Sequence, residues 1–297
     1  MKIVIALLSV SLILFTVKAE DTIPTSPSHW KYKAVGAING TSASFKNWNA
    51  GGQNTISWIA LFDAQANYKK DNLRWENGLH LAYGQNRVLI NPWQKTDDIL
   101  SIYSKIGYRV TKAFDIAMLN DFKTQFDLSK DSDGNLLSKF MAPAYLINAF
   151  GMEYKPNDNL QVFGSPFTGK STFVKDFSLS QAGAFGVDNG KTVRYEFGAF
   201  IKFLYNDEIM KNVTFKGKLE LFSNYLNNPQ NIDINAEALF NFKINKWLSA
   251  SWSFNMIYDD DIDIVVLDDA GVEIAKGPRA QLKNVIGIGL SYSFIDK

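Results

Sequence analysis

The sequence of 297 residues contains no cysteine and only two histidines. The missing cysteine excludes a disulfide framework, a thiolate zinc or iron–sulfur site, and a lipoprotein whose lipid is attached to cysteine. Two histidines are too few for a multi-histidine metal centre. We therefore expect no metal site and no cofactor in this chain.

An excess of charge of one sign is also missing. Lys and Arg together number 31 and Asp and Glu 30, which gives a formal net charge of +1. A dedicated nucleic-acid-binding protein would show a basic excess, so no nucleic-acid partner is expected. Aromatic residues, by contrast, make up 14% of the chain, a high share for a soluble enzyme.

Long apolar runs are absent except at the N-terminus. Lys2 precedes the apolar run 3–17, and Val17-Lys18-Ala19 places small residues at the usual cleavage spacing. We interpret residues 1–19 as a secretory signal peptide that is cleaved after Ala19. A membrane-anchoring helix is the alternative, but such a helix needs ~20 apolar residues. Residues 20–29 are interpreted as a linker, which leaves 30–297 as one domain.

The rest of the chain alternates apolar and polar residues with a period of two, which predicts β-strands with one apolar face. In the clearest run, one face carries Val193, Tyr195, Phe197, Ala199, Ile201, Phe203 and Tyr205. The same pattern is present in 56–68, 73–83, 100–108, 114–126, 144–154, 213–221, 234–244, 248–258 and 286–294. No long stretch shows the helical period.

The length of these runs favours a membrane barrel. Several exceed the ~5–6 residues of an average strand, whereas a tilted strand that crosses a bilayer needs roughly nine to eleven. Aromatic residues lie near run ends on the apolar face, as in interfacial girdles: Tyr68, Tyr83, Tyr108, Phe114, Tyr154, Tyr205, Tyr258 and Phe294. The alternative is a secreted sandwich or a soluble barrel, but the opposite faces are too polar for a dry core.

The connections between runs alternate in length. Short links are expected at 69–72, 110–113, 156–159, 206–212 and 245–247, and long ones at 46–54, 86–96, 127–143, 167–192, 225–233 and 259–283. Outer-membrane barrels have short periplasmic turns and longer outside loops. With 32–45 and 160–165 included, we predict an all-β, transmembrane antiparallel barrel of about twelve strands, or fourteen if 160–192 holds another hairpin. The segment 264–275 is expected to form a hairpin on the last loop.

Several short motifs occur in order along the first half of the chain: Trp48-Asn49-Ala50-Gly51-Gly52, Trp75-Glu76-Asn77, Tyr83-Gly84, Lys95-Thr96-Asp97-Asp98, Gly107-Tyr108, Gln125-Phe126 and Pro143-Ala144-Tyr145. Together they resemble an uncharacterised outer-membrane β-barrel family of Bacteroidota, a domain of unknown function. The resemblance implies the fold and a location in the bacterial outer membrane, but no activity. The ending Leu290, Tyr292, Phe294 also resembles the signal read by the barrel-assembly machinery, although three residues follow it.

Residues 164–171, Gly-Ser-Pro-Phe-Thr-Gly-Lys-Ser, match the phosphate-binding loop pattern. That motif needs a helix directly after Lys170, because the helix N-terminus supplies the field that binds phosphate. The residues that follow are β-rich instead. We therefore expect a Pro/Gly turn in an outside loop and no nucleotide site.

Three other polar groups are weaker candidates. His80 falls on the polar face, so an envelope-lipid hydrolase with a Ser–His pair at the lipid-facing rim is not favoured, and the chain is not expected to be an enzyme. Asp131, Asp133 and Asn135 form an incomplete calcium loop and are interpreted as a polar hairpin tip. The acidic run Asp259, Asp260, Asp261 and Asp263 is interpreted as a solvated loop, with divalent bridges to lipopolysaccharide as the alternative.

The polar faces of the runs carry nine basic and nine acidic residues, with Asp63, Asp115 and Asp233 among the acidic ones. The candidate lumen-lining residues are Arg74, Glu76, His80, Lys105, Arg109, Asp121, Lys123, Glu153, Arg194, Glu196, Lys202, Lys216, Lys218, Glu220, Glu237 and Lys243. A twelve-stranded barrel is intermediate between barrels filled by side chains and barrels with open channels. Because opposite charges are neighbours on adjacent runs, we expect a narrow or plugged lumen.

These features predict an outer-membrane barrel that passes or binds a small polar solute of unknown identity. The alternative is a non-conducting barrel with a structural, adhesive or accessory role of its outside loops. Its expected partners are outer-membrane lipid and lipopolysaccharide, and the barrel-assembly machinery during insertion.

Overall fold

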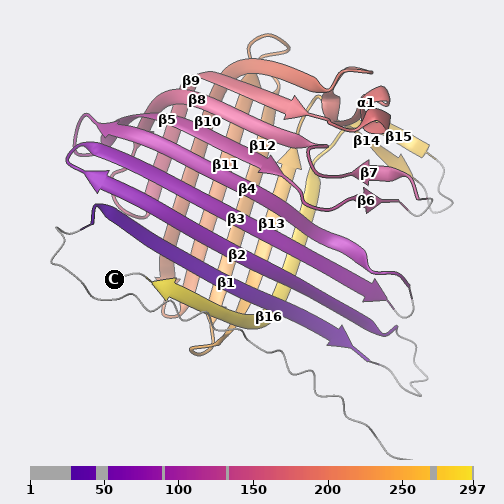
Figure 1. The fold of residues 1–297 in the computed structure, drawn as a ribbon, viewed down its shortest axis with the longest axis horizontal. Coiled ribbons are helices and arrows are strands. Elements are labelled where there is room, and N and C mark those ends of the chain that lie inside the picture. Colours follow the sequence, from indigo (N-terminus) through magenta and orange to yellow (C-terminus); the bar gives the residue numbers. More distant parts are fainter. Residues whose placement is uncertain (1–27, 45–52, 89–90, 132–133, 268–272, 296–297) are drawn as a thin grey trace, which may run out of the picture.

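The computed structural model describes residues 28–44, 53–88, 91–131, 134–267 and 273–295. The expected signal peptide, most of the linker and the Trp48–Gly52 motif lie outside these ranges. Twelve strands form a closed barrel in the order β1-β16-β13-β12-β11-β10-β9-β8-β5-β4-β3-β2 (Figure 1). The barrel strands are β1 (Trp30–Ala43), β2 (Thr55–Lys70), β3 (Leu73–Val88), β4 (Gln94–Arg109), β5 (Phe114–Thr124), β8 (Ala144–Tyr154), β9 (Leu160–Phe173), β10 (Val193–Met210), β11 (Val213–Asn224), β12 (Ile232–Lys243), β13 (Leu248–Tyr258) and β16 (Gln281–Ile295).

All neighbouring strands in the barrel are antiparallel, and the predicted all-β barrel of about twelve strands is confirmed. The extra hairpin in 160–192 that fourteen strands would require is not formed, because a short helix and a 3-10 turn follow β9 there. Four other short strands form two separate two-stranded sheets outside the wall, β6 (Ser129–Lys130) with β7 (Leu136–Ser138), and β14 (Asp263–Leu267) with β15 (Glu273–Pro278). The hairpin expected on the last loop is therefore present.

Helical structure in the described ranges is limited to α1 (Phe177–Gln181) and the 3-10 turn η1 (Ala184–Gly186). Within those ranges, no helix has the length and apolar character needed to cross a membrane.

The predicted alternation sets the two faces of each wall strand. On β10, Tyr195 is 74% exposed on the outer surface, whereas its inward neighbour Glu196 is 4% exposed. Large apolar side chains such as Ile102, Phe150 and Ile286 are likewise exposed on the outside. An outward apolar surface with a polar interior is typical of barrels that span membranes.

Aromatic rings gather near both rims of the outer surface. Trp30 contacts Tyr68 and Trp75 near the short-turn rim, with centroids 5.2 Å and 5.5 Å apart. Phe114 and Tyr154 pair at the same rim, with centroids 4.9 Å apart. At the opposite rim the pairs are Trp58–Tyr83 and Phe197–Tyr225. This arrangement corresponds to two interfacial girdles.

The connections alternate between short and long as predicted, but several strands extend further than their patterns indicated. β3 and β4 leave only residues 89–93 between them, and β10 continues to Met210, so that the turn to β11 is 211–212. The tight turns use residues that tolerate positive φ, with Asp71 at 50° and Asn212 at 65°. The expected short seventh strand, 160–165, is in fact β9 and runs to Phe173.

The long connections at 125–143 and 174–192 pack against each other outside the barrel. Their contact is a small apolar cluster, which contains Ala142, Val174, Leu179 and Val187 with Leu136 and Phe185 at its margin. We call residues 125–143 and 174–192 the outer cap. Asp176 caps α1, because its carboxylate accepts a hydrogen bond from the Leu179 amide at 3.0 Å, and it also pairs with Lys139 at 2.5 Å.

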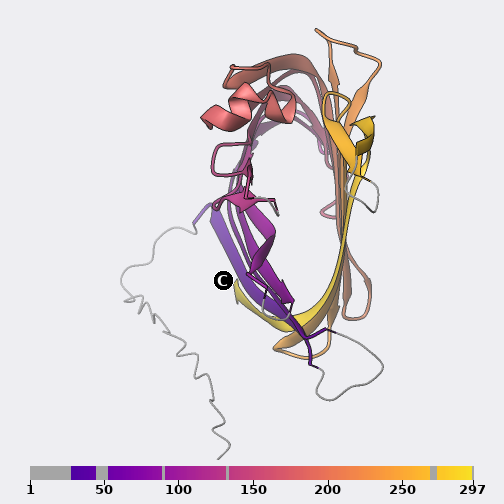
Figure 2. The same cartoon turned by 90° about the vertical axis from the view of Figure 1, so that its right-hand side faces the viewer.

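The barrel is a flattened ring, with the indigo-to-magenta strands on one side and the orange-to-yellow strands on the other (Figure 2). It is closed by β1 and β16, which pair only from Lys33–Ile295 to Gly40–Ile288. β1 pairs with β2 along its whole length, from Trp30–Tyr68 to Ala43–Thr55. The seam between the first and last strands is therefore paired only over the half of β16 that lies near the short turns.

Candidate functional site: the barrel interior

The structure places the sixteen candidate residues on inward positions of the wall, but it divides them into two environments. Inward side chains of β4, β5, β8, β9, β10 and β11 are mostly buried, and we call this side the filled half. Inward side chains of β1, β2, β13 and β16 are mostly accessible, and we call this side the open half. β3 and β12 lie at the borders between them.

An ion cluster closes the filled half near the short turns. Arg74 on β3 pairs with Asp115 on β5 at 2.9 Å, and Arg109 approaches the same carboxylate at 3.6 Å. Beside it, Lys105 lies between Glu76, at 2.9 Å, and Glu153 on β8. Lys105 and Glu153 are 4% and 2% exposed, so this cluster has little contact with water.

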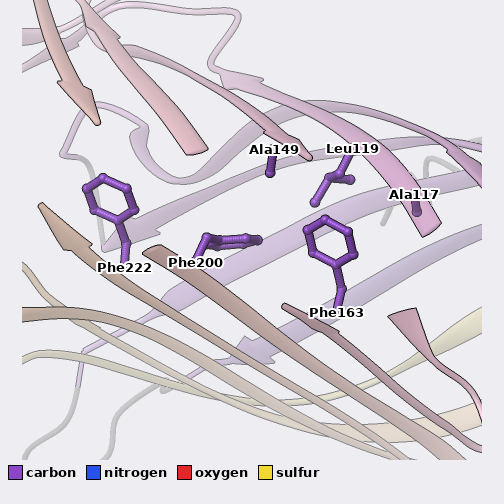
Figure 3. Close-up of a cluster of buried hydrophobic side chains, with 6 residues drawn as sticks. All are labelled: Ala117, Leu119, Ala149, Phe163, Phe200 and Phe222. Atoms are coloured by element: carbon purple, nitrogen blue, oxygen red, sulfur yellow. The ribbon is translucent and has the colours of Figure 1, made fainter. Parts of the chain in front are cut away.

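Next to these ions, an apolar cluster fills the middle of the lumen in the filled half (Figure 3). Phe163, Phe200 and Phe222 come from β9, β10 and β11, and each is at most 5% exposed. They pack with Leu119 from β5 and with small residues of β5 and β8. The rings of Phe163 and Phe200 have centroids 6.4 Å apart. These inward phenylalanines, which interrupt polar faces in the sequence, block the filled half with packed side chains.

A second ion network joins strands that are not neighbours. Lys202 on β10 contacts Asp121 on β5 at 3.1 Å and Glu220 on β11 at 2.8 Å. Lys123 on β5 also reaches Glu220, at 3.1 Å, and Asn235 on β12 donates to the same carboxylate at 2.9 Å. Because these contacts run from β5 to β10 and β11 through the interior, they tie the two sides of the flattened ring together.

The phosphate-loop-like segment is a barrel strand, so the expected turn in an outside loop is wrong. Residues 164–171 lie within β9, and the register shifts opposite β8 and β10 show a bulge around Ser165 and Phe167. Pro166 is tolerated there, because a bulge does not need its missing N–H. Lys170 points inward to Asp233 at 2.6 Å, Asp259 at 3.4 Å and Glu196 at 3.6 Å. Its ammonium is held by three carboxylates instead of a phosphate.

The acidic run after β13 is not simply a solvated loop. Asp259 is 8% exposed and faces Lys170. Asp261 accepts from Arg194 at 3.1 Å, and Arg194 also pairs with Glu196 at 3.0 Å. The run thus binds Lys170 of β9 and Arg194 of β10, but it stays partly solvated, because Asp261 is exposed and Asp263, paired at 3.8 Å with Lys276, is exposed as well.

The polar tip at Asp131 and Asn135 is stabilised internally. The Asn135 amide donates to Asp131 at 2.8 Å, between β6 and β7. Asp133 of the calcium-loop hypothesis lies outside the described residues. Within the described residues, no group of three or more potential metal ligands is present.

The open half has a different lining. Its inward positions carry mostly small or uncharged polar side chains, such as Asn39, Ser57, Gln65, Ser251, Ser253 and Asn255. Apolar residues (Val35, Ile59, Leu61, Ile257 and Val285) and the charged Lys33, Asp63 and Lys283 lie among them. Among the described side chains of β1, β2, β13 and β16, only Ser249 and Gly287 are buried on this face. The open half is thus an accessible and mostly polar face of the wall.

The charged residues in and beside the open half remain accessible. Asp63 on β2 and His80 on β3 form a hydrogen bond of 2.8 Å, yet their side chains are 51% and 41% exposed. Lys33 and Lys216 act on Asp63 electrostatically. Glu237 pairs with Lys218 but is 43% exposed, and Lys216 and Lys243 are exposed near the short turns.

Sequence reasoning missed the residues that cross the loop end of the lumen. Lys283 on β16 donates to the Thr96 carbonyl at 3.1 Å and to Asp97 on β4. Lys170 was also missed as a lumen residue, because its motif was assigned to a loop. The alternation of β16 could have placed Lys283 in the lumen, because Leu282 and Ile286 lie on the opposite, outer face of the strand.

Two families match parts of the chain. Protein of unknown function (DUF3078) matches residues 41–129, and Protein of unknown function, DUF481, matches residues 178–264. Each match spans less than half of the chain, so neither assigns the chain to a family. A comparison with curated proteins gave no match.

Several solved structures are similar at low identity. The COG4313 outer membrane channel from Pseudomonas putida F1 is 11% identical with a TM-score of 0.40, covering 92% of this chain and 100% of that chain. The NanC porin is 7% identical with a TM-score of 0.37, covering 89% and 100%. The P. putida toluene transporter TodX is 10% identical with a TM-score of 0.32, covering 92% and 92%. These likenesses are too distant to assign an activity.

Proposed function

We propose that the protein spans the bacterial outer membrane and passes small polar solutes along the open half of its lumen. The apolar outer surface, the two aromatic girdles and strands of 11 to 18 residues support membrane insertion. The observation that carries the pore is the accessible, mostly polar lining of the open half, beside a filled half whose described inward side chains are mostly buried.

The lining suits solutes that hydrogen-bond and are not selected strongly by charge. Serine, asparagine and glutamine side chains both donate and accept hydrogen bonds, so they replace water around a polar solute. Charges of both signs border the path at Asp63, Lys33 and Lys216, which favours weak ion selectivity.

The test is single-channel conductance of the protein refolded into planar bilayers. Ser251→Trp puts a large ring into the open half, whereas Ala250→Trp puts the same ring on the outer surface of β13, one residue away. We expect discrete conductance steps from the wild type, smaller or absent steps from Ser251→Trp, and unchanged steps from Ala250→Trp. Silence of a folded, β-rich wild type, or equal effects of the two variants, would contradict the pore.

A second function is favoured by the outer cap, which has its own apolar core and lies at the loop end of the filled half. In this alternative the barrel does not conduct and displays the cap to an outside partner. Deletion of α1 and η1 would then remove partner binding, while bilayer conductance would be absent from both proteins.

The proposed placement also implies contacts during and after insertion. Outer-membrane lipid, including lipopolysaccharide, would cover the apolar outer surface, and the barrel-assembly machinery would read the alternating end of β16. The register of β16 places Leu290, Tyr292 and Phe294 at alternate positions opposite Ile38, Gly36 and Ala34, which supports this reading.

A further inference from the structure

A row of polar residues crosses the apolar outer surface. Asn77 on β3 lies opposite Ser104 on β4, Ser104 opposite Asn120 on β5, and Asn120 opposite Asn148 on β8. The row continues to Gly169 on β9, which has no side chain. All five positions point outward, because the residues before and after them in each strand face the lumen.

The rows on both sides of this polar row are apolar. Two residues along each strand in one direction lie Leu79, Ile102, Phe122 and Leu146, and in the other direction lie Trp75, Ile106, Met118 and Phe150. The polar row therefore is not part of a rim. On β5 and β8, strands of 11 residues each, Asn120 and Asn148 lie well inside the strand, at the level of the bilayer core.

The two ends of the row differ in their hydrogen bonds. The Trp75 ring N–H donates to Ser104 at 3.0 Å, Ser104 donates to Asn77 at 2.9 Å, and Asn77 donates to the Ala66 carbonyl at 3.2 Å. The side-chain amides of Asn120 and Asn148 make no hydrogen bond among the residues that the structure describes, although their backbones are paired in the sheet. Asn148 is exposed, and the position of Gly169 beside it is open. Two adjacent carboxamides thus face lipid without partners, an unfavourable arrangement in hydrocarbon.

We propose that this wall is the contact between two copies of the chain, centred on Asn120 and Asn148. Copies inserted by one route share an orientation, so their two-fold axis is parallel to the membrane normal. Neighbouring strands are ~4.8 Å apart and tilted by ~40°, so an axis between the two residues offsets each asparagine from its symmetry mate by about 4 Å sideways. Asn120 and Asn148 differ in depth by about 3 Å in the same geometry.

Four carboxamides then meet within hydrogen-bond reach. A carboxamide both donates and accepts hydrogen bonds, so the group is complementary to its own copy and needs no second kind of partner. Exposed apolar side chains surround the site, with Met118, Phe150 and Met152 being 46%, 54% and 53% exposed. In the dimer they would exclude lipid from the central polar contact, as the rim of an interface excludes solvent. A lipid headgroup fits less well, because headgroups lie at the membrane surface and not at mid-strand depth.

The absence of cysteine from the chain makes a cross-linking test clean. Asn148→Cys is introduced alone, reconstituted in lipid vesicles at low protein-to-lipid ratio, and oxidised. The matched control is Ile286→Cys on β16, which is 70% exposed on a different part of the outer surface. We expect at least a tenfold larger disulfide-linked dimer fraction for Asn148→Cys. Equal fractions for the two variants would overturn the proposal.

A second variant tests the amides themselves. The double substitution Asn120→Leu with Asn148→Leu keeps the outer surface apolar, and Ala250→Leu serves as control. We expect the dimer dissociation constant, measured by single-molecule photobleaching in vesicles, to rise at least tenfold for the double variant only. An unchanged constant, a monomeric wild type, or a wild type that retains lipid which the double variant loses would contradict the contact.

This inference rests on insertion into a membrane but not on conductance. A folded dimer that passes no current would refute only the pore, and conducting monomers would refute only the dimer contact.

Discussion

In the filled half of the lumen, Asp121 and Glu220 are each 5% exposed, whereas Asp63, in the open half, has a side chain that is 51% exposed. Both halves come from the same alternation of polar and apolar residues along long strands. They differ in the size of the inward residues: phenylalanines and long charged side chains in one, serine, glycine and asparagine in the other. Alternation therefore decides which face is inward, and side-chain volume decides whether that face leaves space.

The difference also separates two roles of charge. In the filled half, lysine and glutamate are desolvated and must pair across the lumen, so their ion pairs hold the strands together. At the border of the open half, charges keep their water, so they contribute little to stability and act on solutes instead. The following substitutions test this contrast.

The largest expected effect is on the buried network. Glu220→Gln removes the carboxylate that Lys123 and Lys202 share, which leaves Lys123 without its carboxylate partner and the buried Lys202 with Asp121 alone. Loss of one partner of a buried ion pair costs about 3–5 kcal/mol. We expect that loss in the free energy of unfolding, measured by urea titration in lipid vesicles. Glu237→Gln, at an accessible site, should cost less than ~1 kcal/mol. A similar cost for the two substitutions would contradict the distinction between buried and accessible charges.

Next comes the apolar cluster. Phe200→Ala should lower the free energy of unfolding by about 3 kcal/mol, because it empties a packed site. Phe203→Ala on the outer face of the same strand is the control, and lipid can fill the space that it leaves. If the cluster is the plug, Phe200→Ala also raises single-channel conductance, while Phe203→Ala does not. Unchanged conductance in a folded Phe200→Ala protein would show that another group closes the filled half.

A smaller effect is expected in the outer cap. Asp176→Ala removes the N-cap of α1 and should destabilise the cap by about 1 kcal/mol, measured as faster proteolysis within residues 174–192. Lys139, Ser178 and the Leu179 amide hold the pKa of the Asp176 carboxyl well below its usual value.

The sign of the pH dependence follows from that lowered pKa. The folded-state pKa is below the unfolded value of about 3.9, so the stabilisation is present above that pH and is lost as the pH falls. Wild-type proteolysis should therefore approach that of Asp176→Ala only in acid. Acid sensitivity that is equal in both proteins would assign the effect to another group.

The smallest effect on stability is expected at Asp63. Asp63→Asn keeps the shape of the side chain and should change the free energy of unfolding by less than ~1 kcal/mol. It removes a negative charge beside Lys33 and Lys216, so the reversal potential in a salt gradient should shift toward anion preference. A large loss of stability without any shift in the reversal potential would show that Asp63 has a structural role like that of the buried ion pairs.

The sequence was sufficient for the wall and for the alternation of its strands, because a period of two is a local property of each strand. Strand ends were less accurate, since β9 and β10 continue through residues such as Pro166 and Asn206 that are typical of turns. The bulge accommodates Pro166 only because neighbouring strands adapt, as at Gly151, where an added Cβ would lie 2.0 Å from the Gly164 carbonyl oxygen.

The division of the interior was beyond sequence reasoning. Whether Lys123 meets Glu220 or water depends on how flat the ring is, and flattening is a property of all twelve strands together. The same holds for Lys170, whose three carboxylates come from β10, β12 and the segment after β13. The row from Asn77 to Asn148 needed the register of four strands, which no single run contains.

The incomplete pairing of β1 with β16 bears on the order of assembly. These strands are the first and last of the barrel, so their contact has the greatest separation along the chain of any in the wall, and closing so long a loop is entropically costly and slow. It is also held along only part of its length. Pairing of β1 with β16 is therefore expected to be the last step of barrel closure. Under mechanical load or in an unsuitable bilayer, these two strands would be the first to separate.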